Sequence, residues 1–356
     1  MSYLRTNNCL KFSIVAICLL FLQTLSAQSK KHTREYGTDR FPEVDAMITQ
    51  KQKMLGQDLV VMIWKDTLVY RKEMGEFNSK TVAPLEAASS WLTAAFVLQM
   101  VDEGKISLDD KISRYIPVFD KYGKSYITLR HCLSHMTGIQ ADKSGLFQKK
   151  KNSSLEEVVE GFAKNEIQTN PGTEFRYSNI GPIIAARVVE IVYKKKFDML
   201  IRQKLFMPLA MRQTSFSTLD GSAPNPADGA KSTAIDYLNF LQMLLNNGRF
   251  SGKQVLSESS VKELKRIHAS SANAKNSPKG AEGFGYALGS WVAEEGKNGE
   301  AGSLSGTGLS GTWPVVDFCR GYACLFFVKS PASEQTSGTY MEIKGEIDER
   351  LKGGCQ

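Results

Sequence analysis

Residues 92–117 read LTAAFVLQMVDEGKISLDDKISRYIP, and the helical pattern WLTAAFVLQMVDEG at residues 91–104 covers the first half of this stretch. They belong to a mainly helical region that extends to about residue 247. Strand patterns lie on both sides of this region, at residues 58–75, 284–293 and 312–330. Strands at both ends with helices between them predict an α/β fold, in which one antiparallel sheet is formed by both chain ends and a mainly helical lobe is inserted.

Smaller patterns fill in this outline. Residues 58–75 are expected to form two strands joined at Lys65-Asp66. Helical periodicity predicts further helices before, within and after the central region, at residues 44–55, 154–165, 180–195, 232–248 and 342–353.

The first 27 residues have the pattern of a secretory signal peptide. Arg5 and Lys11 precede an apolar run from Phe12 to Leu22, and the small residues Ser26 and Ala27 follow. The run is shorter than the roughly 20 residues that a membrane span needs, and no later segment approaches that length. We therefore expect a secreted or periplasmic protein without a transmembrane segment after signal removal.

The remaining residues, 28–356, are long enough for one large domain with a substantial core. We expect a sheet lobe of about residues 36–80 and 280–356 and a helical lobe of about residues 81–279. The formal net charge of the full chain, +8, falls to +6 without residues 1–27, and no aromatic residues are interleaved with the basic ones. This pattern indicates a solvated surface and no nucleic-acid partner.

Four cysteines lie beyond the signal peptide: Cys132, Cys319, Cys324 and Cys355. Cys319 and Cys324 flank the expected turn within residues 312–330, so a disulfide between them is one possibility in an oxidising compartment. Buried free thiols are the alternative.

Four stretches together resemble the serine β-lactamase and penicillin-binding-protein superfamily, especially its class C-like branch of esterases, D-aminopeptidases and carboxypeptidases. They are residues 92–117, ITLRHCLSHMTGI at 127–139, PGTEFRYSNIGPIIAARVVE at 171–190, and ADGAKSTAIDYLNFLQMLLNNG at 227–248. The resemblance extends from about Phe41 to the end of the chain. It implies a β-lactamase/transpeptidase-like fold and acyl-transfer chemistry without a cofactor or a metal.

The family's reaction needs a serine at a helix start with a lysine one turn later, so that hydroxyl and amine share one helical face. Alignment on Thr93-Ala94 puts the nucleophile at Ala87 and the lysine at Ser90. Both catalytic residues are therefore replaced, and we expect the site to be catalytically degenerate.

Other family elements are partly retained. Tyr177 and Asn179 match a Tyr-Xaa-Asn element, whereas Gly306 stands where a basic residue precedes Thr307-Gly308. Without the two cations, we expect the phenol of Tyr177 to stay protonated. The resemblance also implies two backbone N–H donors for an oxyanion, from Ala87 and Leu309.

Two displaced serines offer an alternative nucleophile. Ser89 and Ser90 lie beside the position, but Leu92 and Thr93, three residues later, are not bases. The Ser259-Xaa-Xaa-Lys262 match on a polar helix is interpreted as a chance surface match.

Histidine and tryptophan side chains are expected to be mainly structural. His131 and His135 lie four apart on an expected helix, a spacing that suits zinc, but no acidic third ligand is near and core or capping roles are favoured. We expect His268 to be solvated. Trp91, Trp291 and Trp313 are candidates for the walls of a cleft, with packing as the default.

Three functions remain open from the sequence. The first is a family member that binds a small molecule, a peptide, a cell-wall fragment or an ester-like ligand without acylation. The second is an active serine hydrolase that uses Ser89 or Ser90, and the third is a scaffolding module with a closed cleft.

Overall fold

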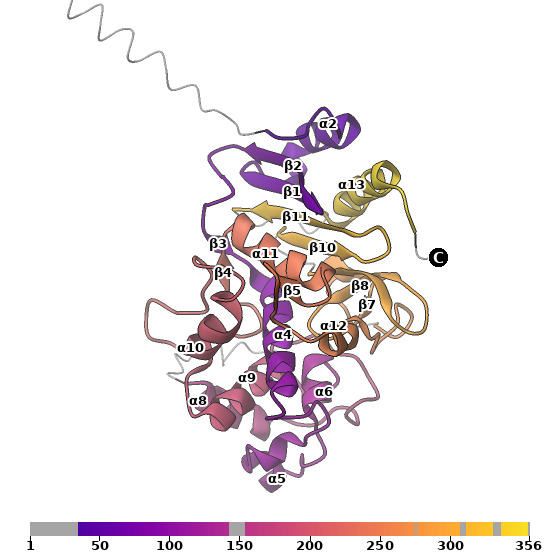
Figure 1. Cartoon of the computed structure of the whole chain (residues 1–356). Coiled ribbons are helices and arrows are strands. Elements are labelled where there is room, and N and C mark those ends of the chain that lie inside the picture. The colour runs from indigo at the N-terminus through magenta and orange to yellow at the C-terminus, as the bar shows by residue number, and fades with distance from the viewer. Residues whose placement is uncertain (1–34, 142–153, 275, 307–310, 330–335, 355–356) are drawn as a thin grey trace, which may run out of the picture. The chain divides into compact units, whose positions relative to one another are not determined.

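The main sheet is built from both ends of the chain. A computed structural model describes residues 35–141, 154–274, 276–306, 311–329 and 336–354, and within these residues the sheet has seven antiparallel strands in the order β2-β1-β11-β10-β9-β8-β7. The strands are β1 (Leu59–Lys65), β2 (Thr67–Met74), β7 (Gly285–Tyr286), β8 (Trp291–Glu295), β9 (Ala301–Ser305), β10 (Trp313–Asp317) and β11 (Tyr322–Val328). Because Leu59 of β1 pairs with Val328 of β11, the predicted sheet is confirmed (Figure 1).

The hairpin at residues 58–75 is also confirmed. Its turn is at Asp66, whose φ of 60° lies in the left-handed region. The patterns did not predict β9, whose sequence AGSLS consists mainly of small residues instead of the β-branched and aromatic residues typical of strands. The strand predicted at residues 284–293 is interrupted, because residues 287–290 form the turn between β7 and β8.

The helices occupy the middle of the chain and its two ends. They include α2 (Pro42–Gln50), α3 (Gln52–Leu55), α4 (Ser89–Asp102), α5 (Val118–Lys121), α6 (Leu129–Leu133), α8 (Leu155–Lys164), α9 (Ile180–Tyr193), α10 (Phe197–Ile201), α11 (Ala234–Leu245), α12 (Glu258–Lys265) and α13 (Thr336–Leu351). Short strand pairs, β3 (Ala83–Pro84) with β4 (Lys231–Ser232) and β5 (Arg249–Phe250) with β6 (Lys253–Gln254), lie between them. The mixed α/β architecture therefore agrees with the sequence patterns.

Both faces of the sheet are covered by helices. Val60 and Met62 of β1 face the core that contains α4, α9 and α11. Val61 and Ile63 alternate with them and face a second core formed with α2 and α13. Figure 1 shows α2 and α13 on one side of the sheet and α11 on the other.

α4 is the central helix of the larger core. Its residues from Ser89 to Leu98 are all buried, which is typical of a helix with apolar neighbours on every side. Its first turn therefore starts inside the protein, next to the predicted catalytic positions.

A buried ion-pair network fastens α13 to the sheet. Lys344 lies 2.8 Å from the carboxylate of Asp317, which is fully buried, and 2.7 Å from that of Asp348. Arg320 lies 2.9 Å from Asp317 and 2.8 Å from Glu294. The carboxylates of Glu294, Asp317 and Asp348 approach one another closely enough for a metal site. Each of them already forms an ion pair with Lys344 or Arg320, so we assign a structural role.

The predicted signal peptide, residues 1–27, lies outside the described residues. In the part of the chain that is described, no helix combines the length and the apolar composition needed to cross a membrane.

We expect Lys344→Met to lower the free energy of unfolding by about 3 kcal/mol, because the buried Asp317 carboxylate loses one of its two cations. Urea unfolding measures this change. The matched control is Lys329→Met at the half-exposed pair with Asp58, where we expect a change below about 1 kcal/mol. Equal effects of the two substitutions would refute the structural role of the network.

Candidate active site

Ala87, at the predicted nucleophile position, has a side chain with no reactive atom. Ala87 lies in a short 3-10 helix, η1 (Glu86–Ala88), which leads directly into α4. Its side chain is half-buried. The carbonyl of the next residue, Ala88, accepts a 2.9 Å hydrogen bond from the buried hydroxyl of Tyr237, so this segment is fixed from the α11 side.

Three hydroxyl groups at the start of α4 hold a neighbouring turn. Ser89, Ser90 and Thr93 are all buried, and each bonds to the backbone of the turn at residues 225–230. The bonds are Ser89 Oγ accepting from Ala230 N–H at 3.0 Å, Ser90 Oγ donating to Ala227 O at 2.8 Å, and Thr93 Oγ1 donating to Pro226 O at 2.6 Å.

These bonds give Ser89 and Ser90 a structural role. The hydroxyl proton of Ser90 is directed to a carbonyl, and the oxygen of Ser89 receives a backbone N–H. Among the described residues, no lysine, histidine or carboxylate forms a hydrogen bond with either hydroxyl. A serine nucleophile needs such a base, so this arrangement does not favour attack by either serine.

Tyr177 lies in a cluster of aromatic side chains. Its ring centroid is 4.6 Å from that of His135 and 5.2 Å from that of Trp291. Burial raises the pKa of the Tyr177 phenol well above its ordinary value, and the nearby charge of Asp228 raises it further. The phenol is therefore neutral at physiological pH and is a poor general base.

Asn179 directs its side chain to Asp228, a residue that the sequence reasoning missed. Asn179 Nδ2 donates to Asp228 Oδ2 over 3.1 Å. Asp228 lies in the turn that Ser90 tethers, within the stretch ADGAKS. The family-like pattern of that stretch was visible, but a single aspartate in a turn carries no signal for its partner 49 residues away.

His135 contacts the Tyr177–Asn179 segment through its ring. It is buried, its Nδ1 accepts the backbone N–H of Ser178 at 3.4 Å, and its Nε2 lies 2.8 Å from the hydroxyl of Tyr286. Since Nδ1 accepts, we assign the ring proton to Nε2, which donates to Tyr286. Burial lowers the pKa of His135 from 6.5 to about 3, so the ring is neutral.

The expectation that His131 and His135 share one helix was wrong. α6 ends at Leu133, and His135 has a left-handed φ of 55°. His131 instead forms a reciprocal capping box with Thr128 at the start of α6. The two histidines therefore do not form a zinc-binding pair, and the capping role favoured for His131 is confirmed.

His268 also differs from the prediction. It follows the end of α12 at Lys265, and its side chain is only 11% exposed. Burial lowers its pKa to about 4. The solvated position expected from the polar sequence around it was therefore wrong, because the segment packs beside Tyr286.

Gly306 has no room for a side chain. A Cβ atom there would lie 2.8 Å from Cγ of Pro314 and 3.3 Å from Cβ of Ala88. A lysine or histidine would require the proline to move. Thr307, Gly308 and Leu309, the other residues expected at this edge, lie outside the described residues.

Of the three tryptophans considered for the walls of a cleft, only Trp291 adjoins the candidate site. Trp91 packs edge-on against Phe240 in the larger core, and Trp313 stacks on Tyr340 in the core on the far side of the sheet. Trp91 and Trp313 therefore have the packing role that was expected by default.

The cysteine pairing is partly resolved. Cys319 takes part in a disulfide, whereas Cys132 and Cys324 are free and buried. The possible bridge between Cys319 and Cys324 is therefore not formed. Cys324 points into the core beneath α13, away from the turn, because residues alternate between the two faces of β11. Cys355 lies outside the described residues.

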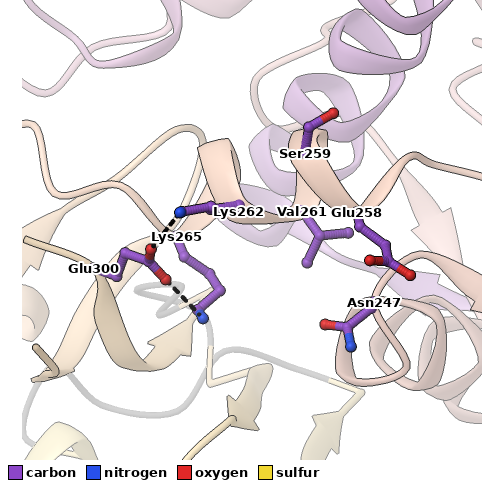
Figure 2. Close-up of a pocket in the computed structure, with 7 residues that line it drawn as sticks. All are labelled: Asn247, Glu258, Ser259, Val261, Lys262, Lys265 and Glu300. Carbon is purple, nitrogen blue, oxygen red and sulfur yellow. Dashed lines mark ion pairs between the residues drawn. The ribbon is translucent and has the colours of Figure 1, made fainter. Parts of the chain in front are cut away.

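The Ser259-Xaa-Xaa-Lys262 match lies on the surface helix α12. Figure 2 shows the two side chains pointing in different directions, with Lys262 directed to Glu300. Lys262 Nζ is 3.6 Å from that carboxylate, and Ser259 Oγ is 2.8 Å from Ser257 Oγ. The two residues therefore do not form a catalytic pair.

We expect His135→Gln to flatten the dependence of stability on pH. The unfolded chain protonates this histidine below about pH 6.5, but the folded protein does so only near pH 3. Its stabilising effect is thus complete above pH 6.5 and is lost as the pH falls toward 3, by about 1.4 kcal/mol per pH unit. Urea unfolding of the wild type and the variant at pH 7 and pH 5 tests this. An equal loss of unfolding free energy in both proteins between pH 7 and pH 5 would contradict it.

Comparison with known proteins places the chain in a family. The Beta-lactamase family model matches residues 44–341. The protein flp of Staphylococcus aureus (strain N315) is 28% identical over 141 residues, which are 38% of this chain and 28% of flp. A putative D-alanyl-D-alanine carboxypeptidase of Escherichia coli (strain K12) is 23% identical over 223 residues, 54% of this chain and 50% of that protein. The chain thus spans half or less of the length of these curated relatives.

Solved structures share the fold over most of the chain. A putative beta-lactamase from Bacteroides dorei DSM 17855 has a TM-score of 0.72 at 24% identity, covering 85% of this chain and 99% of that one. EstCE1, a hydrolase with promiscuous acyltransferase activity, has a TM-score of 0.74 at 18% identity, covering 87% of this chain and 98% of that one. With the family match over residues 44–341, the chain belongs to the beta-lactamase family.

Proposed function

We propose that this protein is an exported member of the beta-lactamase family that no longer forms an acyl-enzyme and acts by binding a peptide, a cell-wall fragment or an ester-like ligand. The observation that carries the proposal is Ala87 at the predicted nucleophile position. Ser90, at the predicted lysine position, donates its hydroxyl to the backbone of the turn at residues 225–230. Export is supported by the signal-peptide pattern of residues 1–27.

The proton-transfer side of the site supports the same proposal. Tyr177 is neutral because its phenol is buried, and Gly306 has no space for a cation. Loss of the nucleophile lowers the turnover of a well-studied serine protease by about 10⁶-fold. The nucleophile, the lysine and the second cation are all replaced here, so restoring one of them does not rebuild the reaction.

The remaining groups favour a ligand related to the family's acyl substrates. Tyr177 and Asn179 are half-buried and keep polar atoms at the site. Among the related proteins, one is described as a putative D-alanyl-D-alanine carboxypeptidase and another as a hydrolase with acyltransferase activity. We extend the peptide and ester classes to this chain as binding partners.

Intact-mass spectrometry of the protein without residues 1–27 tests the absence of acylation. We expect no adduct after incubation with a fluorophosphonate or, separately, with a penicillin, since neither serine at the start of α4 has a base. An adduct that maps to Ser89 or Ser90 and disappears in the corresponding alanine variant would refute the proposal and establish an active serine hydrolase.

We expect Ala87→Ser alone to remain unlabelled by penicillin. The new hydroxyl would have Ser90 one turn away, and the Tyr177 phenol, which the family resemblance implies as the other proton acceptor, is protonated. Neither group accepts the proton of the new hydroxyl. The same mass measurement checks this, with the thermal midpoint as the control for folding. Rapid acylation at position 87 would show that a working base survives and would contradict our reading of Tyr177.

A further inference from the structure

The carboxylate of Asp228 is only half satisfied. Its Oδ2 accepts the hydrogen bond from Asn179, whereas its buried Oδ1 has no hydrogen-bond partner among the described residues. No lysine, arginine or histidine in the described part of the chain forms an ion pair with it either. Buried polar atoms are nearly always paired, so this oxygen calls for an explanation.

The position of the carboxylate is fixed by the structure around it. Its turn is closed by the hydrogen bond from Gly229 N–H to Asn225 O at 2.8 Å. Ser90 then ties the turn to α4 through the carbonyl of Ala227. Because the turn that carries this carboxylate is already ordered, little further conformational freedom is lost when a ligand binds.

Two further oxygen atoms lie beside Asp228 with capacity to accept hydrogen bonds. Neither the hydroxyl of Tyr177 nor the side-chain oxygen of Asn179 has a hydrogen bond to the described residues. The Tyr177 ring packs against His135 and Trp291, which fixes the position of its hydroxyl. The neighbouring His135 is neutral, so it supplies no competing positive charge.

The residue at the family's lysine position is decisive for the charge of this site. The resemblance implies an ammonium group at position 90, next to the turn that carries Asp228. Here Ser90 is neutral and bonds to that turn. The carboxylate therefore has no ion-pair partner among the described residues.

We infer that Tyr177, Asn179 and Asp228 form a subsite for a protonated primary amine of the ligand. An ammonium group has three N–H donors and no acceptor, which matches the acceptors on these three side chains. The inference rests on the proposed function, and it adds that the part of the peptide or ester that enters this site carries a positive charge.

The test compares two probes of nearly equal shape: alaninamide, which is cationic at about pH 6, and lactamide, in which a hydroxyl replaces the amine. Titrations followed by NMR use the protein without residues 1–27, its Asp228→Asn variant and the control Asp66→Asn. Asp66 is an exposed residue of the β1–β2 turn with φ of 60°, so the control makes the same charge change away from the site.

We expect the wild-type protein and Asp66→Asn to bind alaninamide at least about tenfold more tightly than lactamide, as for a hydrogen bond to a charged group. Asp228→Asn is expected to lose this preference while keeping its thermal midpoint within a few degrees. Equal affinities in the wild type, no detectable binding, or an unchanged preference in Asp228→Asn would overturn the inference.

Failure of the inference is distinguishable from failure of the proposed function. A covalent serine adduct refutes the non-acylating function and leaves the preference for the ammonium probe intact. Loss of that preference without any adduct refutes only the amine subsite.

Discussion

The hydrogen bonds between the start of α4 and the turn at residues 225–230 are the constraint on which the candidate site depends. They bury three hydroxyl groups and connect segments more than 130 residues apart. Gly289, in the turn between β7 and β8, packs on the same helix start, where a Cβ would lie 2.6 Å from the carbonyl oxygen of Ser90. The helix start is therefore held by the sheet and the helical lobe together.

This constraint changes the character of the site. The family resemblance implies a hydroxyl and an amine at the start of this helix. In this protein Ser90 presents its hydroxyl to a backbone carbonyl instead, and Ala87 presents a methyl group. Tyr177 stays neutral, and Asp228 brings a negative charge. This arrangement supports our proposal that the site binds a ligand without acyl transfer.

Much of the fold was predictable because long apolar periodic segments specify helices and strands. α4, α9 and α11 were predicted to within a few residues, and strands from both chain ends share one sheet as predicted, although the pairing of β1 with β11 was not specified. The small residues of β9 carry no strand signal. The left-handed backbone at His135 could not be read from a helical spacing, and it overturned the expected helix.

The candidate site was predictable only in part. The local patterns around Ala87, Ser90, Tyr177 and Asn179 identify these positions through the family resemblance. The hydrogen-bond partners of Ser90 and Asn179 are set by tertiary packing, and no local sequence pattern predicts them. The lack of space at Gly306 likewise depends on Pro314 and Ala88, which the fold brings next to it.

The most direct test of a binding site without acyl transfer is ligand-observed NMR of the methyl ester of alanyl-alanine, which carries both an amine and an ester, over one day with the protein lacking residues 1–27. The account predicts that the ligand signals broaden when protein is added, recover on dilution, and keep the ester bond intact. Ester cleavage faster than in a sample with heat-denatured protein, or signals that never broaden, would contradict it.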